Sequence, residues 1–157
     1  EGYHIPGIHP EFFKAIDFEQ FETTAGDNLV RMTAPTKGSL FYRGRWLWMW
    51  PNWTLSFFNG GMNTSRINPL GVDRTELIYD FYFSDVSDAA SDSRQETIQR
   101  NIAVIEQDFD ICIHTHQNYL SGGYQPGPLS PRHEKGVHLF QDLVKQHIGK
   151  AREALAD

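Results

Sequence analysis

The chain has 157 residues, of which 13% are aromatic, and this composition favours one packed globular domain over a disordered segment. Its 14 basic and 20 acidic residues give a net charge of −6 without any basic run, which argues against nucleic acid or an anionic membrane surface as a partner. A single cysteine excludes an intrachain disulfide and no apolar run reaches the roughly 20 residues of a membrane span, so we expect a reducing, cytoplasmic location.

The first ten residues, E-G-Y-H-I-P-G-I-H-P, hold His4 and His9 five positions apart around a Pro-Gly pair. On one unbroken helix, residues five apart point roughly 140° away from each other and cannot easily share a cation. Pro6 disfavours the α region for the residue before it and Gly7 permits a tight bend, so His4 can end one helical turn and His9 can return from the next segment. This spacing permits a shared metal ion, with surface or capping histidines as the alternative.

Residues 9–16 predict a short helix with Pro10 in its first turn, and residues 17–28 read as an acidic, polar loop. The middle of the chain favours strands, because aromatic and β-branched residues dominate there and turn signals separate the runs. The expected strands are 29–34, two strands within 46–58 that meet at Pro51, 62–67 and 75–84. The last of these alternates between unlike residues, which is the period of a sheet with two different faces.

A long amphipathic helix is expected over residues 94–118, and a second helix over about 134–155. Apolar positions of the long helix recur every three or four residues, at Ile98, Ile102, Ile105, Phe109 and Cys112. Asp108 lies on this apolar side, where a carboxylate is costly unless it is paired or bound to metal. It is therefore the candidate third ligand, with Glu106 and Asp110 as alternatives and a solvated helix-edge acid as the non-metal reading. Cys112 is expected as a buried apolar side chain rather than a nucleophile.

These segments together resemble a known family. The pattern E-x-Y-H-x-x-x-x-H-P resembles the iron-binding signature of Rieske non-haem iron oxygenases, in the catalytic domain of their α subunits. Further collinear matches are residues 51–52, 63–71, 106–112, 123–127 and 136–140. The resemblance spans essentially the whole chain and is nearest to the choline monooxygenase-like branch, which acts on small quaternary amines.

The resemblance and the order of elements agree on an α+β fold of the helix-grip (START/Bet v1-like) type, an antiparallel sheet around a long C-terminal helix. We expect residues 1–157 to form one catalytic, mononuclear-iron domain. In the family, a Rieske iron–sulfur domain with the ligand pattern C-x-H…C-x-x-H precedes the catalytic domain. This pattern is absent from the present sequence. The chain is therefore expected to be a C-terminal fragment of a longer polypeptide with an upstream Rieske domain.

The resemblance also implies the cofactors and partners. Fe(II) would be bound by His4, His9 and Asp108, which is the two-histidine, one-carboxylate set of non-haem Fe(II) oxygenases. A [2Fe–2S] Rieske cluster in the upstream domain would supply electrons from NAD(P)H through a separate reductase or ferredoxin. Glu1 matches the family's acidic residue that bridges the cluster of a neighbouring subunit to an iron-ligand histidine, which implies a homotrimer.

The implied activity is O₂ activation at Fe(II) to hydroxylate or N-dealkylate a small organic substrate. Aromatic ring hydroxylation and quaternary-amine oxidation both remain open, because residues 113–118 depart from the family pattern. Four tryptophans could form an aromatic cage for a quaternary ammonium, with a core or interface role as the simpler interpretation: Trp46, Trp48, Trp50 and Trp53. A non-enzymatic helix-grip carrier of a hydrophobic ligand is the alternative function, and it would need no iron.

Overall fold

The computed structural model describes residues 4–37 and 44–154. One sheet of six strands forms the centre of the fold, and each strand pairs antiparallel with its neighbour in chain order. The strands are β1 (Glu22–Gly26), β2 (Leu29–Thr33), β3 (Arg45–Met49), β4 (Trp53–Phe58), β5 (Gly61–Pro69) and β6 (Thr75–Phe83). The helices are α1 (Ile5–Ile8), α2 (Pro10–Ala15), α3 (Ser91–Leu120) and α4 (Lys135–Ala154), with 3₁₀ turns η1 (Phe18–Gln20) and η2 (Asp88–Ala90). The α+β prediction is confirmed.

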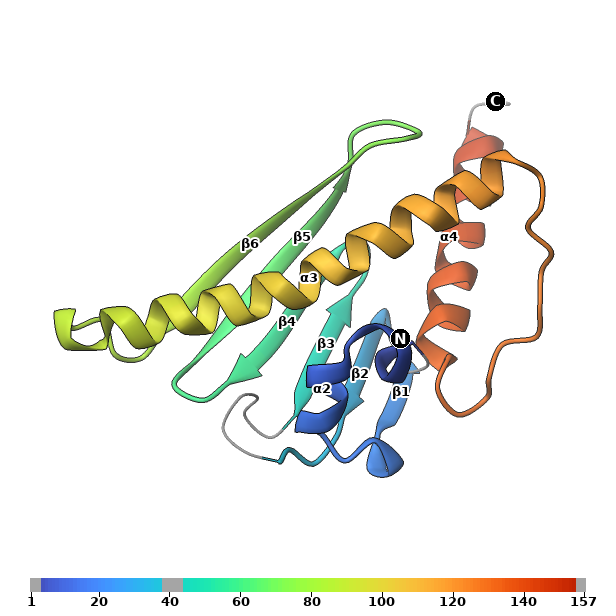
Figure 1. Ribbon diagram of the computed structural model, residues 1–157. Helices are drawn as coiled ribbons and strands as arrows, with labels where there is room; N and C mark the ends of the chain where they lie inside the picture. Colours follow the sequence, from blue (N-terminus) through green and yellow to red (C-terminus); the bar gives the residue numbers. More distant parts are fainter. Residues whose placement is uncertain (1–3, 38–43, 155–157) are drawn as a thin grey trace.

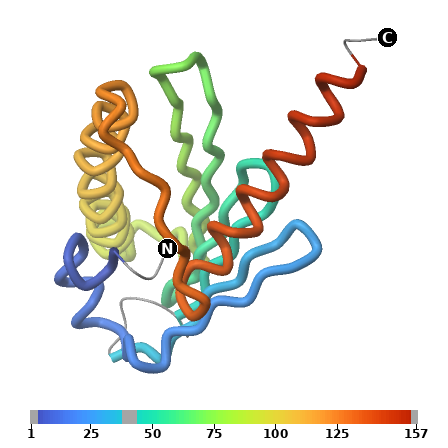
Figure 2. The backbone as a smooth tube through the Cα atoms, turned by 90° about the vertical axis from the view of Figure 1, so that its right-hand side faces the viewer, coloured from blue at the N-terminus to red at the C-terminus, as the bar shows by residue number. Residues whose placement is uncertain are grey.

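The long helix α3 crosses one face of the sheet, and the short helices α1 and α2 lie beside it (Figure 1). The side chain of Asn63 on β5 donates a 3.1 Å hydrogen bond to Asn101 of α3, which identifies the face of the sheet that α3 covers. Figure 2 shows α3 on one side of the β5–β6 hairpin and α4 beside the β1–β2 hairpin. Within the described ranges, no helix is both long and apolar enough to cross a membrane.

The core lies at the end of the sheet where the N-terminal segment packs. Its buried cluster contains Ile5, Ile16, Phe21 and Ala34, with Phe12, Phe18, Met32 and Trp46 packed against it. Full burial of an Ile or Phe side chain contributes about 1.5–3 kcal/mol. Because Ile5 is the first residue of α1 and Ile16 directly follows α2, this cluster fixes the segment that contains the two N-terminal histidines.

Part of the predicted loop 17–28 is a strand. β1 pairs with β2 through a tight turn at Asp27 and Asn28, which have positive φ angles of 50° and 65°. Asp and Asn tolerate this left-handed conformation, and consecutive positive φ values suit the turn of a two-residue hairpin. This strand could not be predicted from its polar sequence. β1 lies at the edge of the sheet, and Thr23 is its only buried residue.

The expected apolar stripe of the long helix is only partly buried. Ile98, Ile102 and Ile105 are half-buried, whereas Phe109 is 47% exposed. Cys112 is exposed, so the prediction of a buried thiol is wrong. A periodic pattern shows which residues share a helix face, but it does not show how far along the helix a packing partner extends.

The four tryptophans do not surround one point. Trp48 pairs with Thr54 and Met49 with Trp53, so Trp48 and Trp53 lie on opposite faces of the sheet. Trp46 packs edge-to-face on Phe12, with ring centroids 5.2 Å apart. Trp48 and Trp50 pack on Phe140 of α4, at 5.5 and 6.1 Å. A cage of all four is excluded, and packing roles apply to the three that face the helices.

Candidate metal centre

The first two ligand candidates are placed by a bend in the N-terminal segment. His4 is the N-cap of α1, and Pro6 and Gly7 lie inside this short helix. The bend falls at His9, which has φ −117° and ψ 68° and ends α1 directly before α2 begins at Pro10. The bend had been expected at the Pro-Gly pair, but proline is tolerated in a first helical turn and disfavours the α region for the residue before it. Pro10 therefore places the bend at His9.

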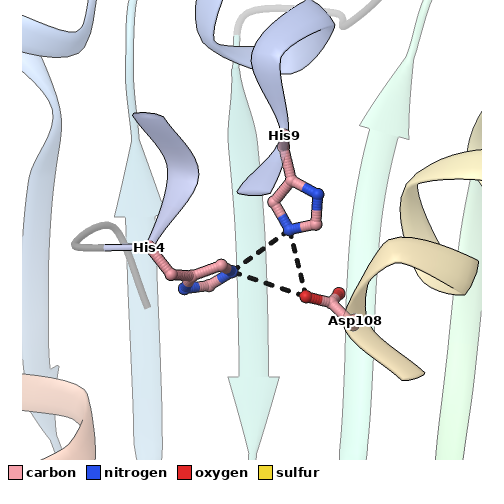
Figure 3. A group of neighbouring side chains, drawn as sticks. All are labelled: His4, His9 and Asp108. Atoms are coloured by element: carbon pink, nitrogen blue, oxygen red, sulfur yellow. Dashed lines mark hydrogen bonds and ion pairs between the residues drawn. The ribbon is translucent and has the colours of Figure 1, made fainter. Parts of the chain in front are cut away.

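Three side-chain atoms converge at this point (Figure 3). The Nε2 atom of His9 lies 3.0 Å from Oδ1 of Asp108 and 3.2 Å from Nε2 of His4. The remaining edge of the triangle, from His4 Nε2 to Asp108 Oδ1, measures 3.6 Å. Among the described residues these three form a group that could hold one metal ion.

Two edges of the triangle, 3.0 and 3.2 Å, are close to those of one face of a coordination octahedron, and the third, 3.6 Å, is longer. Donor atoms that each lie roughly 2.1 Å from an ion, at right angles to each other, are roughly 3.0 Å apart. Two imidazoles and one carboxylate on one face leave the opposite positions for other ligands, which is the pattern of non-haem Fe(II) sites. The donor types fit as well, since two imidazole nitrogens and one carboxylate are ligands that a divalent transition metal accepts. The residues present therefore fit a divalent metal.

The three side chains differ in burial. His9 is 3% exposed, whereas the side chains of His4 and Asp108 are 38% and 46% exposed. One candidate ligand is thus fixed inside the protein, and the other two border a region open to solvent. Small molecules can approach the centre from that side.

Asp108 influences two neighbouring acids. Burial raises the pKa of the Tyr79 phenol, a hydrogen bond with Ser65 lowers it, and the negative charge of Asp108 raises it further. Although Cys112 as a whole residue is exposed, its thiol is partly desolvated, which raises its pKa, and Asp108 adds to this shift. Both groups therefore stay neutral at physiological pH.

A fourth residue contacts the group and was missed in the sequence. Nδ1 of His9 lies 2.8 Å from Oε1 of Gln107, the residue before Asp108 on α3. No spacing rule pointed to this residue, because the partner of a ligand's second ring nitrogen is set by the fold. Its position beside the candidate carboxylate was the only available signal.

The other candidates lie outside this group. Glu106 and Asp110 do not belong to it, although they flank Asp108 on the same helix. Glu1 lies outside the described residues. A cavity of about 1020 Å³ is lined by strands β1 to β3 and by Arg132 and Lys135, but by none of the three ligand candidates.

Sequence comparisons relate the chain to known proteins. A model of the family "Ring hydroxylating alpha subunit (catalytic domain)" matches residues 36–150, which include Asp108 but not the two histidines. Chloroplastic choline monooxygenase from Atriplex hortensis is 25% identical over 149 residues, covering 92% of this chain and 34% of that protein. The Spinacia oleracea protein of the same name is 23% identical over 153 residues, covering 93% and 35%. The chain thus spans about a third of the length of these relatives.

A solved structure has the same fold. The crystal structure of the quaternary ammonium Rieske monooxygenase CntA, in complex with an inhibitor, matches with a TM-score of 0.75 at 21% identity. The match covers 93% of this chain and 43% of that one, and it confirms the predicted helix-grip architecture. Together with the family match over residues 36–150, these findings lead to one conclusion: the chain belongs to the ring hydroxylating alpha subunit family of Rieske-type oxygenases, in the region of its catalytic domain.

Proposed function

We propose that this chain is the catalytic domain of a Rieske-type oxygenase and binds one Fe(II) ion through His4, His9 and Asp108. The observation that carries the proposal is the triangle of donor atoms, with edges of 3.0, 3.2 and 3.6 Å. Family membership supports the same assignment. A non-enzymatic carrier of a hydrophobic ligand is not favoured, because it has no use for three converging donors.

The side chains have separable tasks in this proposal. Bound Fe(II) would supply the binding and reduction of O₂, which the amino acids alone cannot perform. Two neutral imidazoles and one carboxylate leave a net charge of +1 on such a site, which suits a reduced oxygen species. The buried ring of His9 fixes the ion relative to the core, and the half-exposed His4 and Asp108 leave one side accessible.

The electrons must come from outside this chain. We propose an upstream Rieske domain with a [2Fe–2S] cluster, which NAD(P)H reduces through a separate reductase or ferredoxin. In this scheme the chain assembles as a homotrimer, and Glu1 connects the cluster of a neighbouring subunit to an iron-ligand histidine. The cluster is supported by the name of the solved relative, a Rieske monooxygenase. The trimer and the role of Glu1 rest on the resemblance of the N-terminal motif.

The proposed substrate is a small quaternary amine, which the protein would hydroxylate or N-dealkylate. The support lies in the printed names of its relatives, choline monooxygenase and a quaternary ammonium Rieske monooxygenase. Aromatic ring hydroxylation is the second candidate, and the name of the matching family favours it. Both reactions insert oxygen and need the same iron site, so the site itself does not separate them.

Turnover by the longer protein that contains the Rieske domain tests this function. With a reductase, NADH and O₂, we expect product from choline or another quaternary amine, and much less from a simple aromatic compound. The isolated 157-residue chain should give no product under the same conditions, because it has no internal route for electrons. Sustained turnover by the isolated chain would contradict the Rieske-type assignment, and product from aromatics alone would overturn the proposed substrate.

A further inference from the structure

His9 is the most buried of the three candidate ligands, and both of its ring nitrogens have partners. Nε2 faces Asp108 at 3.0 Å, and Nδ1 lies 2.8 Å from the side-chain oxygen of Gln107. The imidazole is 3% exposed, so water cannot replace a lost partner at low cost. The ring is therefore held from both sides by two consecutive residues of α3.

The chemistry of a neutral imidazole decides the direction of the Gln107 contact. One ring nitrogen carries a hydrogen and the other carries a lone pair. If Nε2 binds a metal, its lone pair is used there and the hydrogen must lie on Nδ1. Nδ1–H then donates to the amide oxygen of Gln107, so the glutamine selects the tautomer in which His9 can act as a ligand through Nε2.

We propose that Gln107 is a positioning residue for the metal centre, which fixes the tautomer and the ring orientation of His9. The inference rests on the proposed metal site. It adds a residue that acts through His9 without touching the ion, the substrate or O₂. Because an amide is neutral, it performs this task without adding a second negative charge beside Asp108, and the net charge of +1 is preserved.

The placement of Gln107 also connects two parts of the molecule. His9 belongs to the N-terminal segment that the core fixes, and Gln107 and Asp108 belong to α3. Consecutive helix residues point about 100° apart, and here they reach opposite nitrogens of one ring. A displacement of α3 would therefore disturb the carboxylate ligand and the tautomer of His9 together.

Metal affinity provides the first test. Gln107→Leu keeps the approximate size of the side chain and removes the acceptor, and Gln107→Glu keeps an acceptor. Titration of the metal-free protein with Co(II) should show about 10- to 100-fold weaker binding for Gln107→Leu, the usual effect of losing such a partner. Gln107→Glu should bind within about threefold of the parent or more tightly. Gln99→Leu, on the exposed side of the same helix, serves as the control and should bind normally.

The Nδ1–H group of His9 provides the second test, by NMR of the protein loaded with Zn(II), a diamagnetic substitute for Fe(II). The metal holds the lone pair of Nε2, so Nδ1 carries the hydrogen, and its proton resonance should lie downfield in the parent protein because the proton is bonded to Gln107. In Gln107→Leu this resonance should move upfield, and in Gln107→Glu it should stay downfield. An unchanged resonance and affinity in Gln107→Leu would overturn the proposal, as would equal losses in the Leu and Glu variants. If the parent protein binds no metal at all, the proposed function fails, whereas a parent that binds metal and a Gln107→Leu variant that is unaffected contradict the role of Gln107 alone.

Discussion

The two halves of the candidate metal centre differ in how they are held. The N-terminal half, with His9, sits on a buried cluster in which Ile16 and Phe21 are 1% and 2% exposed. The other half, Asp108 on α3, is 46% exposed, and no described residue of that 30-residue helix is fully buried. One half is therefore positioned by a fully buried core, and the other by half-buried apolar side chains together with polar contacts. The site should therefore be sensitive to two separable changes, a loss of fold stability and a displacement of α3.

Removal of a core side chain should have the largest effect on stability. Phe21→Ala deletes a buried ring under the N-terminal segment and should cost about 3–5 kcal/mol. In a chain of this length, this corresponds to a melting temperature lower by about 10 °C. Phe109→Ala, on the exposed part of α3, is the matched control and should cost less than about 1.5 kcal/mol. Equal losses in thermal unfolding would contradict the distinction between the two halves.

Loss of a polar contact between α3 and the sheet should have an intermediate effect. Asn63 is 1% exposed and donates to Asn101. Asn101→Ala removes the acceptor and leaves a buried amide group unpaired, which costs about 1–3 kcal/mol. Urea unfolding measures this loss, with the exposed Gln99→Ala as a control. We also expect weaker metal binding, because α3 carries Asp108; normal stability and normal binding would show that α3 is positioned by other contacts.

The smallest expected effect concerns Tyr79 at alkaline pH. Its phenol pKa is raised from the usual 10.0 in the folded protein, mainly by burial. The unfolded chain therefore ionises first, so the stabilising contribution is complete below pH 10 and is lost as the pH rises through the folded pKa. Tyr79→Phe should remove this part of the alkaline loss of stability. Urea unfolding between about pH 8 and 11 measures it, and identical pH profiles for parent and variant would contradict the assignment.

Much of the fold followed from local patterns. The alternation in 75–84 predicted β6, where Tyr79 is half-buried and Asp80 and Tyr82 are exposed. The apolar period predicted α3 to within three residues at each end. β1 was missed because an edge strand needs no apolar face, so its sequence resembles a loop. The exposure of Cys112 was missed because it depends on where the sheet ends beneath α3.

The site was predictable only in part for a similar reason. His4, His9 and Asp108 were singled out by a motif and by a carboxylate on an apolar helix side, and the structure brings these three together. The position of the bend was misplaced because Pro6 and Pro10 compete locally, and only Pro10 interrupts the helix. Gln107 could not be predicted, since its contact joins residues 98 positions apart and depends on how α3 lies across the sheet.

Iron content is the most direct test of the central claim that His4, His9 and Asp108 bind one metal ion. The parent chain, reconstituted with Fe(II) without oxygen and then desalted, should retain one iron per chain by elemental analysis. Asp108→Ala should retain almost none while its helical circular dichroism stays unchanged, and Asp110→Ala, the matched acid two positions along, should retain the parental amount. Stoichiometric iron in Asp108→Ala, together with its loss in Asp110→Ala or Glu106→Ala, would contradict the assignment and move the third ligand to that residue.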